Sequence, residues 1–288
     1  MGKIVGVLVF IIAIGSVLLF VGQKLMFGSV MWWFPQGISE HAPAIDAQFG
    51  RTLVVVGIAF IAAQIALGYA VMRFGRKGDA RAVYTHGSNK LEVTWTIVTA
   101  AVFITLAVLG QRVWIQLHLN AAADTATRVE VVAQQFQWNF HYPGADGVFG
   151  RTEGRYIDDS SLNFVGLDPT DPAGRDDAQL TTLVIPAGRV VELTLRSKDV
   201  IHSFFVPSLR FKQDTVPGMA IKVHFTVDND KVGKYEIPCA ELCGSLHYNM
   251  RSNMVVIPAD EYDRLVAMSE EKFKEQLGDL LQRYQYPQ

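Results

Sequence analysis

One stretch of twelve residues holds both cysteines of the chain together with a histidine, a carboxylate and a thioether: Cys239-Ala240-Glu241-Leu242-Cys243-Gly244-Ser245-Leu246-His247-Tyr248-Asn249-Met250. Thiolate, imidazole and thioether groups together suit copper, whereas magnesium and calcium prefer oxygen ligands. The preceding residues 233–238 read as a β-strand that ends in a proline. A ligand loop that leaves a strand end is held rigidly by the sheet, so this stretch is typical of a metal site in a β-domain.

The spacing of these groups, Cys-x3-Cys-x3-His-x2-Met, separates the kinds of metal site. Zinc sites built mainly from thiolates need three or four cysteines, and a chain with two cysteines cannot supply them alone. A mononuclear blue-copper site uses one cysteine, two histidines and a weak axial methionine. The second cysteine is what a site that bridges two copper ions needs. Such a site also requires a further histidine from elsewhere in the chain.

His202 is the candidate for that histidine. It lies among apolar and β-prone residues, so we expect it at a strand end against a core. The surrounding sequence is Lys198-Asp199-Val200-Ile201-His202-Ser203-Phe204-Phe205-Val206-Pro207. Two alternatives are open at this point: His202 can be an ordinary core histidine, and Cys239 and Cys243 can form a disulfide in an oxidising compartment. Met254 and His224 are interpreted as a core residue and a strand-face residue.

The region from His202 to Met250 resembles the binuclear copper (CuA) centre of subunit II of the haem-copper cytochrome c oxidases. The resemblance implies a set of copper ligands in which the glutamate contributes its backbone carbonyl: His202, Cys239, Glu241, Cys243, His247 and Met250. No position of the family's copper motif is missing. The segments 31–46 and 211–219 are similar to the same family.

The resemblance also implies partners and a reaction. Cytochrome c, or another small electron donor, would dock on the outer domain and reduce the copper pair. The electron would pass to haem a of subunit I, where oxygen reduction is coupled to proton translocation. In the family, the carboxylate at the position of Glu241 also reaches a magnesium ion at the subunit I interface. Other oxidase subunits and membrane lipid are further expected partners, and a nucleic acid is not.

Three apolar runs in the first 115 residues predict membrane helices. Half of the 288 residues are hydrophobic and the mean hydropathy is +0.19, which is high for a soluble protein. The runs cover residues 4–22, 53–72 and 93–110, and each has about the length that spans a bilayer. The first run is either a secretory signal peptide or a retained helix, and its length favours retention. Trp32 and Trp33 after it suit a membrane interface.

The charge of the loop between the second and third runs predicts the orientation. Residues 73–81 together with Lys90 hold five basic residues and one acid, so the positive-inside rule places this loop in the cytoplasm. The C-terminal domain then lies on the other side of the membrane. The expected location is the bacterial plasma (inner) membrane, with a periplasmic C-terminal domain.

Glu92 stands at the start of the third run. A carboxylate at that position has a structural explanation, because the N-terminal end of a helix dipole favours negative charge. Ionisable residues near a membrane also mark proton paths. In the resembled family, a glutamate at the matching place lies at the mouth of a proton channel into subunit I, so Glu92 is a proton-path candidate.

The remaining residues predict a β-sandwich and a terminal helix. Short strands are expected at 128–143, 181–185, 190–195, 221–227, 234–237 and 254–257. The resemblance makes this sandwich cupredoxin-like. The expected organisation is a signal peptide or first helix (1–24), a transmembrane hairpin (25–118), a copper domain (119–258) and a C-terminal helix (259–288).

Phe136 and Trp138 are the candidate electron-input residues. Many members of the family carry Trp-x-Trp here, with the first tryptophan receiving the electron, and this chain has Phe136-Gln137-Trp138. Because residues i and i+2 of a strand share a face, the two rings are expected to form one aromatic patch. Residues 119–288 carry 24 acidic and 17 basic residues, so an acidic rim would steer a basic donor.

Three other functions compete with this interpretation. A quinol oxidase subunit II shares the topology but lacks the copper ligands, which are all present here. A membrane-anchored copper chaperone or storage protein would expose a small labile site in place of six donors. Nitrous oxide reductase has a similar copper motif, but a helical hairpin before the sandwich fits it poorly. The chain contains no Cys-x-x-Cys-His, so it attaches no c-type haem.

Overall fold

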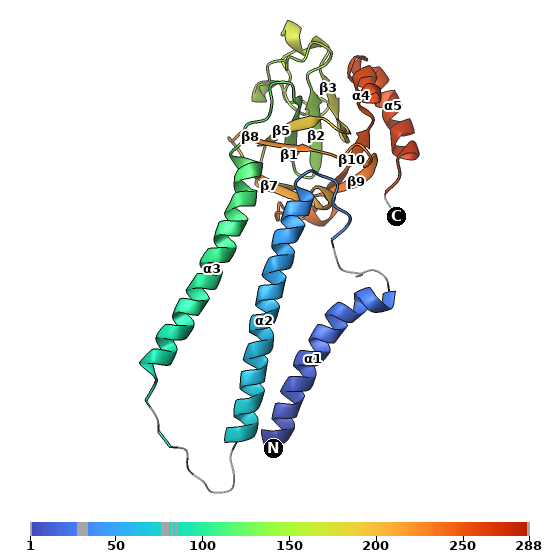
Figure 1. Cartoon of the computed structure of the whole chain (residues 1–288). Helices are drawn as coiled ribbons and strands as arrows, with labels where there is room; N and C mark the ends of the chain where they lie inside the picture. The colour runs from blue at the N-terminus through green and yellow to red at the C-terminus, as the bar shows by residue number, and fades with distance from the viewer. Residues whose placement is uncertain (1, 28–33, 76–80, 82, 85, 287–288) are drawn as a thin grey trace. The chain divides into compact units, whose positions relative to one another are not determined.

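The computed structural model describes residues 2–27, 34–75, 81, 83–84 and 86–286, which form two compact units. One unit is helical and contains Met1–Trp33 and Ala44–Val113. The other, the outer unit, contains Phe34–Pro43 and Trp114–Gln288. Figure 1 shows both, and each is described here by itself.

The helical unit is built from three long apolar helices: α1 (Gly2–Phe27), α2 (Ala42–Phe74) and α3 (Asn89–His118). Each contains a span that is long and apolar enough to cross a membrane, with mean hydropathy between 2.1 and 2.7. Their large apolar side chains are mostly exposed, as expected where lipid is the solvent. The three predicted runs are therefore confirmed as helices, and each helix extends beyond its run because hydropathy marks only the lipid-facing part.

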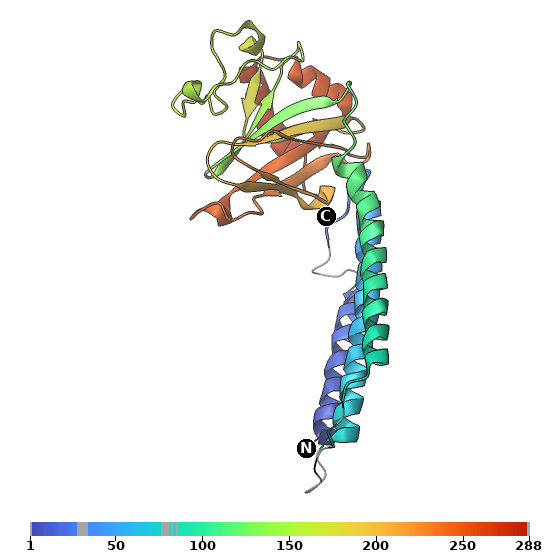
Figure 2. The ribbon, with the colours of Figure 1, turned by 90° about the vertical axis from the view of Figure 1, so that its left-hand side faces the viewer.

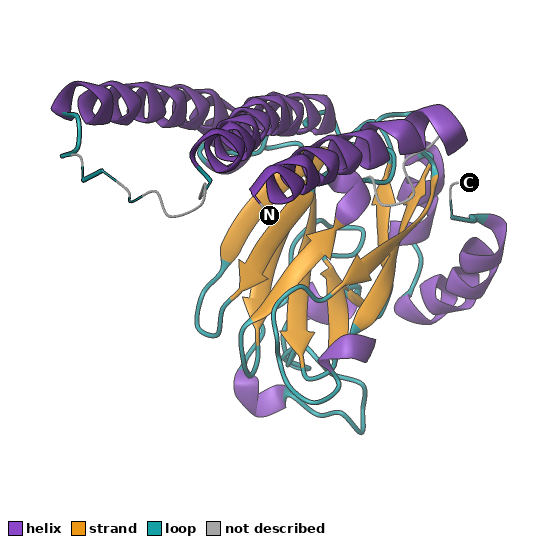
Figure 3. Cartoon of the chain, turned by 90° about the horizontal axis from the view of Figure 1, so that it is seen from below, coloured by secondary structure: helices purple, strands orange, loops and turns teal. Residues whose placement is uncertain are grey.

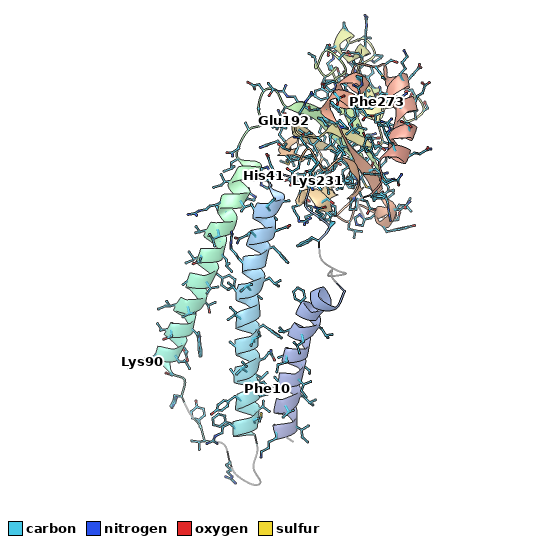
Figure 4. The ribbon with its side chains drawn as sticks, turned by 45° about the vertical axis from the view of Figure 1, so that its right-hand side comes forward. Phe10, His41, Lys90, Glu192, Lys231 and Phe273 are labelled. Carbon is cyan, nitrogen blue, oxygen red and sulfur yellow. The ribbon has the colours of Figure 1, made fainter. Side chains whose placement is uncertain are left out.

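Two glycines allow α1 to lie against α2. A Cβ atom at Gly68 would stand 2.7 Å from the ring of Phe10, and one at Gly6 would stand 2.2 Å from Cγ of Met72. Small residues at such contacts let membrane helices approach closely. The pairs run in opposite directions along the two helices, so α1 and α2 pack antiparallel; Phe10 is labelled in Figure 4.

The outer unit is a β-sandwich. Its strands are β1 (Thr127–Gln134), β2 (Gln137–Tyr142), β3 (Ala178–Leu180), β4 (Leu183–Pro186), β5 (Val190–Ser197), β6 (His202–Val206), β7 (Phe211–Thr215), β8 (Ile221–Thr226), β9 (Gly233–Pro238) and β10 (Arg251–Ile257). They form sheets of order β3-β2-β1-β5-β8, β4-β10-β9 and β6-β7. The strands are drawn as orange arrows in Figure 3. Figure 2 shows the connection between β2 and β3 as yellow-green loops outside the sheets.

The core of the sandwich is formed by strands along which buried and partly exposed residues alternate. On β5, Val191, Leu193 and Leu195 are fully buried while the residues between them are partly exposed. Tyr142 joins the two larger sheets, because its hydroxyl donates to the carbonyl of Val184 (3.1 Å) and accepts from the Val184 amide (2.7 Å). Both groups are buried, so this pairing satisfies polar atoms that would otherwise cost free energy.

Two predicted elements are each divided in the structure. The expected strand over 128–143 is a hairpin, with β1 and β2 joined at Gln135 and Phe136. The expected terminal helix is two helices, α4 (Ala259–Val266) and α5 (Glu270–Arg283), separated at Ser269, whose backbone is extended. Serine favours helix starts over helix interiors, because its hydroxyl competes for backbone hydrogen bonds.

Residues 34–43, which include the first two residues of α2, form a strap on the outer unit. Ile38 is buried, its amide donates to the carbonyl of Ser208 (2.9 Å), and its carbonyl accepts from the Asp228 amide (3.0 Å). The predicted interfacial residues Trp32 and Trp33 lie outside the described residues. So does most of the basic loop, residues 76–80, and its role in orientation stays a sequence prediction.

Candidate metal centre

The predicted ligands come together where the start of β6 meets the loop between β9 and β10. The amide of Cys239 donates to the carbonyl of Met250 (3.0 Å), which ties the two ends of the loop together. The amide of Ala240 donates to the carbonyl of Ser203 (3.0 Å), which ties the loop to the residue after His202. The sandwich therefore places an imidazole from one element beside ligands that are local to another.

Short distances connect the side chains of this cluster. The two thiol sulfurs lie 3.9 Å apart. Sγ of Cys243 lies 3.5 Å from Nδ1 of His247 and 3.7 Å from Sδ of Met250. Sγ of Cys239 lies 3.3 Å from the carbonyl oxygen of Glu241. Both cysteines are free thiols, so the disulfide alternative is not what the structure contains.

His202 is oriented for ligation by Asp199. The Asp199 carboxylate lies 2.8 Å from Nε2 of the imidazole and also accepts the backbone amide of Gln135 (2.6 Å). Nδ1 of His202 is buried and has no hydrogen-bond partner among the described residues. A ring nitrogen of His202 and the sulfurs of Cys239 and Cys243 all lie within 4.8 Å of one another. A carboxylate that fixes one ring nitrogen while the other ligates is the usual arrangement around protein-bound metals.

The two thiols differ in acidity. Burial opposes ionisation of Cys239, but the neighbouring imidazole of His202 and the backbone groups around the thiol lower its pKa to about 6. Burial, and then the charge of the neighbouring Cys239, raise the pKa of Cys243 to about 11. Without a cation the pair therefore carries one negative charge. At neutral pH a bound cation would favour ionisation of both thiols, and a copper pair would supply that positive charge.

Burial varies around the cluster. Cys243 and Met250 are 4% and 2% exposed, so water is largely excluded from the sulfur side. Glu241 is exposed, and His247 is partly exposed. Leu242 and Tyr248 on the same loop are 78% and 76% exposed, which leaves an apolar rim beside a buried polar centre.

The prediction that Phe136 and Trp138 form one aromatic patch is wrong. Trp138 is 1% exposed, with its ring 6.1 Å from that of His202 and 5.5 Å from that of Phe204, centroid to centroid. Phe136 is partly exposed and lies in the turn before β2, against residues 239–250 between β9 and β10, which carry the candidate copper ligands and are called the copper loop. A Cβ atom at Gly244 of this loop would come within 2.9 Å of the Phe136 ring. The hairpin turn interrupts the strand, so the i, i+2 rule does not apply.

Sequence reasoning missed Asp199 and Gln135. The side-chain amide of Gln135 donates to the carbonyl of Cys243 (2.6 Å), so the β1–β2 turn is tied to the copper loop. The contact of Asp199 with His202 could have been predicted, since Asp199 precedes His202 by only three residues. Gln135 had none, because its contact depends on two turns that are far apart in the sequence.

Replacing Asp199 by alanine is expected to weaken copper retention about 10–100-fold, because the imidazole of His202 loses the partner that orients it. Competition with a copper chelator measures the change. The matched control is Asp230→Ala, since Asp230 pairs with the adjacent Lys231 on the surface. Equal copper retention by wild type and Asp199→Ala would contradict the orienting role.

Glu92 lies in the helical unit, in the first turn of α3. Its side chain is exposed and its amide donates to the carbonyl of Ser88 (2.9 Å). This position agrees with the helix-dipole explanation and leaves the proton-path role a prediction.

Comparison with known proteins places the two units in one family. Residues 127–259 match the sequence model described as cytochrome c oxidase subunit II, periplasmic domain, and residues 28–113 match its transmembrane domain. The chain is 36% identical over 260 residues to an alternative cytochrome c oxidase subunit 2 of Bradyrhizobium diazoefficiens, covering 90% of this chain and 89% of that protein.

More distant relatives and solved structures are also similar. A cytochrome c oxidase subunit 2 of Thermostichus vulcanus is 28% identical over 259 residues, covering 80% of this chain and 76% of that protein. A crystal structure of the periplasmic domain of subunit II of cytochrome oxidase of Bradyrhizobium japonicum matches with a TM-score of 0.38 and 24% identity, covering 53% of this chain and 99% of that one.

Proposed function

Because this chain belongs to the cytochrome c oxidase subunit II family, we propose that it accepts electrons from cytochrome c or a similar small donor at a binuclear copper centre. We further propose that it passes these electrons to haem a of subunit I. The chain is a membrane-anchored oxidase subunit with an extracytoplasmic C-terminal domain. The proposal assigns the ligand roles to His202, Cys239, Cys243, His247, Met250 and the carbonyl of Glu241. Subunit I and the other oxidase subunits are the proposed partners in the membrane.

One observation carries the proposal: the buried imidazole of His202, whose Nδ1 has no hydrogen-bond partner among the described residues, shares a cluster with two free thiols. Three kinds of soft or borderline ligand at these distances suit copper. When bound, the copper pair would take up and release one electron with its charge shared over two thiolates.

The residues of the chain would divide the work of the centre. Cys239 and Cys243 would bridge the metals, because each sulfur lies next to a different partner of the cluster. Asp199 would hold His202, and the buried Met250 would keep water from the sulfur side. The hydrogen bond from Gln135 to the Cys243 carbonyl would keep the loop in place while the charge of the centre changes.

The exposed part of the copper loop supports docking on another protein. Leu242, Leu246 and Tyr248 project apolar surface beside the exposed Glu241. Contiguous exposed apolar residues at a rim are typical of interaction sites. We assign this rim to subunit I, with the carboxylate of Glu241 as a magnesium ligand at the interface. Loss of bound magnesium from the assembled oxidase in Glu241→Gln, at unchanged copper content, tests the assignment.

Isolation of the oxidase tests the proposed function directly. Affinity purification through this chain should bring down a haem-containing subunit, with two copper ions on this chain and a mixed-valence signal of seven hyperfine lines. A single copper with a four-line signal would contradict the binuclear centre. Copper that transfers rapidly to an acceptor protein, with no haem subunit attached, would instead identify a chaperone.

Phe136 is the proposed electron-input residue, since it is partly exposed directly over the copper loop while Trp138 is buried behind it. Phe136→Ala is expected to slow oxidation of the donor with copper content unchanged. Tyr156→Ala, a partly exposed aromatic on the β2–β3 connection, serves as the control. Lower thermal stability combined with a normal rate per folded molecule would show a packing role instead.

Glu92 remains the proposed mouth of a proton path. The carboxylate is exposed at the start of α3, where it can exchange protons with water. Glu92→Ala is expected to slow turnover of the assembled oxidase without changing copper content or donor oxidation in a single turnover. If the variant only assembles less well, with normal turnover per complex, the helix-end explanation holds.

A further inference from the structure

A second group of metal-ligating side chains lies in the outer unit, apart from the copper centre. It surrounds an open cavity of about 520 Å³. The wall of the cavity contains Glu40 and His41 from the end of the strap, residues 120–123 that follow α3, Val190, and His224 of β8. The proposed electron transfer uses none of these residues.

The strand register brings the carboxylate and one imidazole to the same face. The amide of Glu40 donates to the carbonyl of Thr226 (3.1 Å), so the strap runs beside β8. Thr226 and His224 are two residues apart on that strand and therefore point to the same side. Val223 and Phe225 point to the other side and are buried in the core. Glu40 and His224 thus flank the cavity on the outer face of the sheet.

His41 provides an independent sign of a ligand. Its Nε2 is buried and has no hydrogen-bond partner among the described residues, although it lies 3.2 Å from a carboxylate oxygen of Glu40. A buried nitrogen without a partner costs free energy that a bound ion would recover. Figure 4 labels His41, together with Glu192, the β5 residue that pairs with His224.

We propose that this cavity binds a divalent transition-metal ion of the zinc class, with His41, His224 and Glu40 as ligands. Two imidazoles and a carboxylate are a set that zinc accepts in proteins, with water in the remaining position. The cavity is open, so water can fill that position. Its described lining contains no lysine or arginine, which disfavours a phosphate or another anion as the occupant.

The ligands come from two elements that are far apart in the sequence, and this gives the ion a structural consequence. A metal held by both would fasten the strap to β8, in addition to the backbone hydrogen bonds already present. Among the described residues, only the donor atoms of His202, Cys239 and Cys243 form a group within 4.8 Å, so the side chains of Glu40, His41 and His224 would have to rotate to close on an ion. That rotation has an entropic cost, and the affinity is expected to be lower than that of the copper centre.

Zinc titration of the full chain in detergent, with the copper centre filled beforehand, tests the proposal. Calorimetry should detect one further zinc ion per chain. His41→Asn and His224→Asn should each weaken its binding by at least about tenfold, because loss even of an outer-sphere partner weakens metal sites 10–100-fold. His86→Asn removes an exposed imidazole from the helical unit and should leave zinc binding unchanged.

Two further measurements keep the test decisive. The absorption of the copper centre should be the same in all variants, which shows that they are folded. Glu40→Gln changes only an exposed carboxylate, so weaker zinc binding in this variant cannot be assigned to misfolding. The proposal fails if the copper-filled wild type binds no zinc, or if the His41 and His224 variants bind zinc as tightly as wild type.

Discussion

Cys239→Ser is expected to remove the binuclear copper signal that the proposed centre should give, leaving at most one copper per chain. The expected loss is complete because each thiolate would bridge both metals, and the hydroxyl of serine is not ionised at neutral pH. Cys239 is the thiol whose pKa is lowered to about 6, so the substitution also removes the group that ionises first. Copper analysis and the hyperfine pattern of the purified chain measure the result.

The fold should survive this change, because serine is nearly isosteric with cysteine and the Cys239 amide keeps its hydrogen bond to Met250. Thermal melting of the copper-free forms checks this point. The matched control is Ser245→Ala, which alters an exposed hydroxyl of the same loop. Two coppers per chain in Cys239→Ser would rule out the bridging role.

His141→Leu is expected to destabilise the outer unit by about 3–5 kcal/mol, because it leaves buried carboxylates without their cation. His141 is fully buried between two acids: Nδ1 lies 3.1 Å from Glu130 and Nε2 lies 2.6 Å from Asp177. Burial disfavours the charged ring, yet hydrogen bonds to Asp177 and Glu130 raise the pKa of His141 above its ordinary value. Asp177 also accepts the Gly150 amide (2.8 Å), so the network anchors the β2–β3 connection.

The dependence on pH distinguishes a charged network from simple packing. Because folding raises the pKa of His141, its protonated ring stabilises the folded state. This stabilisation is fully present below the unfolded pKa of 6.5 and is lost as the pH rises through the folded pKa. Burial alone would raise the pKa of Glu130, but the hydrogen bonds and charges of His141 and Arg196 together lower it, so its contribution is lost as the pH falls below about 4.5. The difference in unfolding free energy between wild type and His141→Leu should therefore be largest between these values.

Chemical denaturation of both proteins at about pH 6 and about pH 8 measures this difference. The difference in unfolding free energy between wild type and His141→Leu is expected to be smaller at the higher pH. Because both proteins keep the proposed copper ligands and are compared without added copper, metal binding does not affect the difference. An equal difference in unfolding free energy at both pH values would show that His141 acts only by filling space.

The sequence predicted the parts of this protein that depend on neighbouring residues. Two cysteines, a histidine and a methionine at fixed spacing within one loop define most of the metal centre, because a short loop between two strands brings its own side chains together. The membrane helices follow from long apolar runs, and strands such as β5 follow from alternation, since both patterns reflect which face of an element meets water or lipid.

The two divided elements show where local patterns stop being informative. Nothing in the alternation of residues 128–143 shows that the chain turns at Gln135 and Phe136, because both halves continue the β-prone pattern. The terminal helix divides at Ser269 so that Phe273 of α5 is buried in the core. In both cases, packing against other elements outweighs a local preference of a few tenths of a kcal/mol per residue.

Only the tertiary structure decided which distant residues meet. The pairing of β6 with β7 and the contact of Ala240 with Ser203 bring His202 to the copper loop, and Asp199 and Gln135 arrive with it. His141 receives its two acids from different parts of the sandwich, and the strap brings His41 to the face of β8 that carries His224. Sequence patterns determined the individual elements and the ligand types, because these depend on local spacing and hydropathy. Contacts between elements depend on how sheets pair and pack, so the orientation of each imidazole was decided by the folded chain.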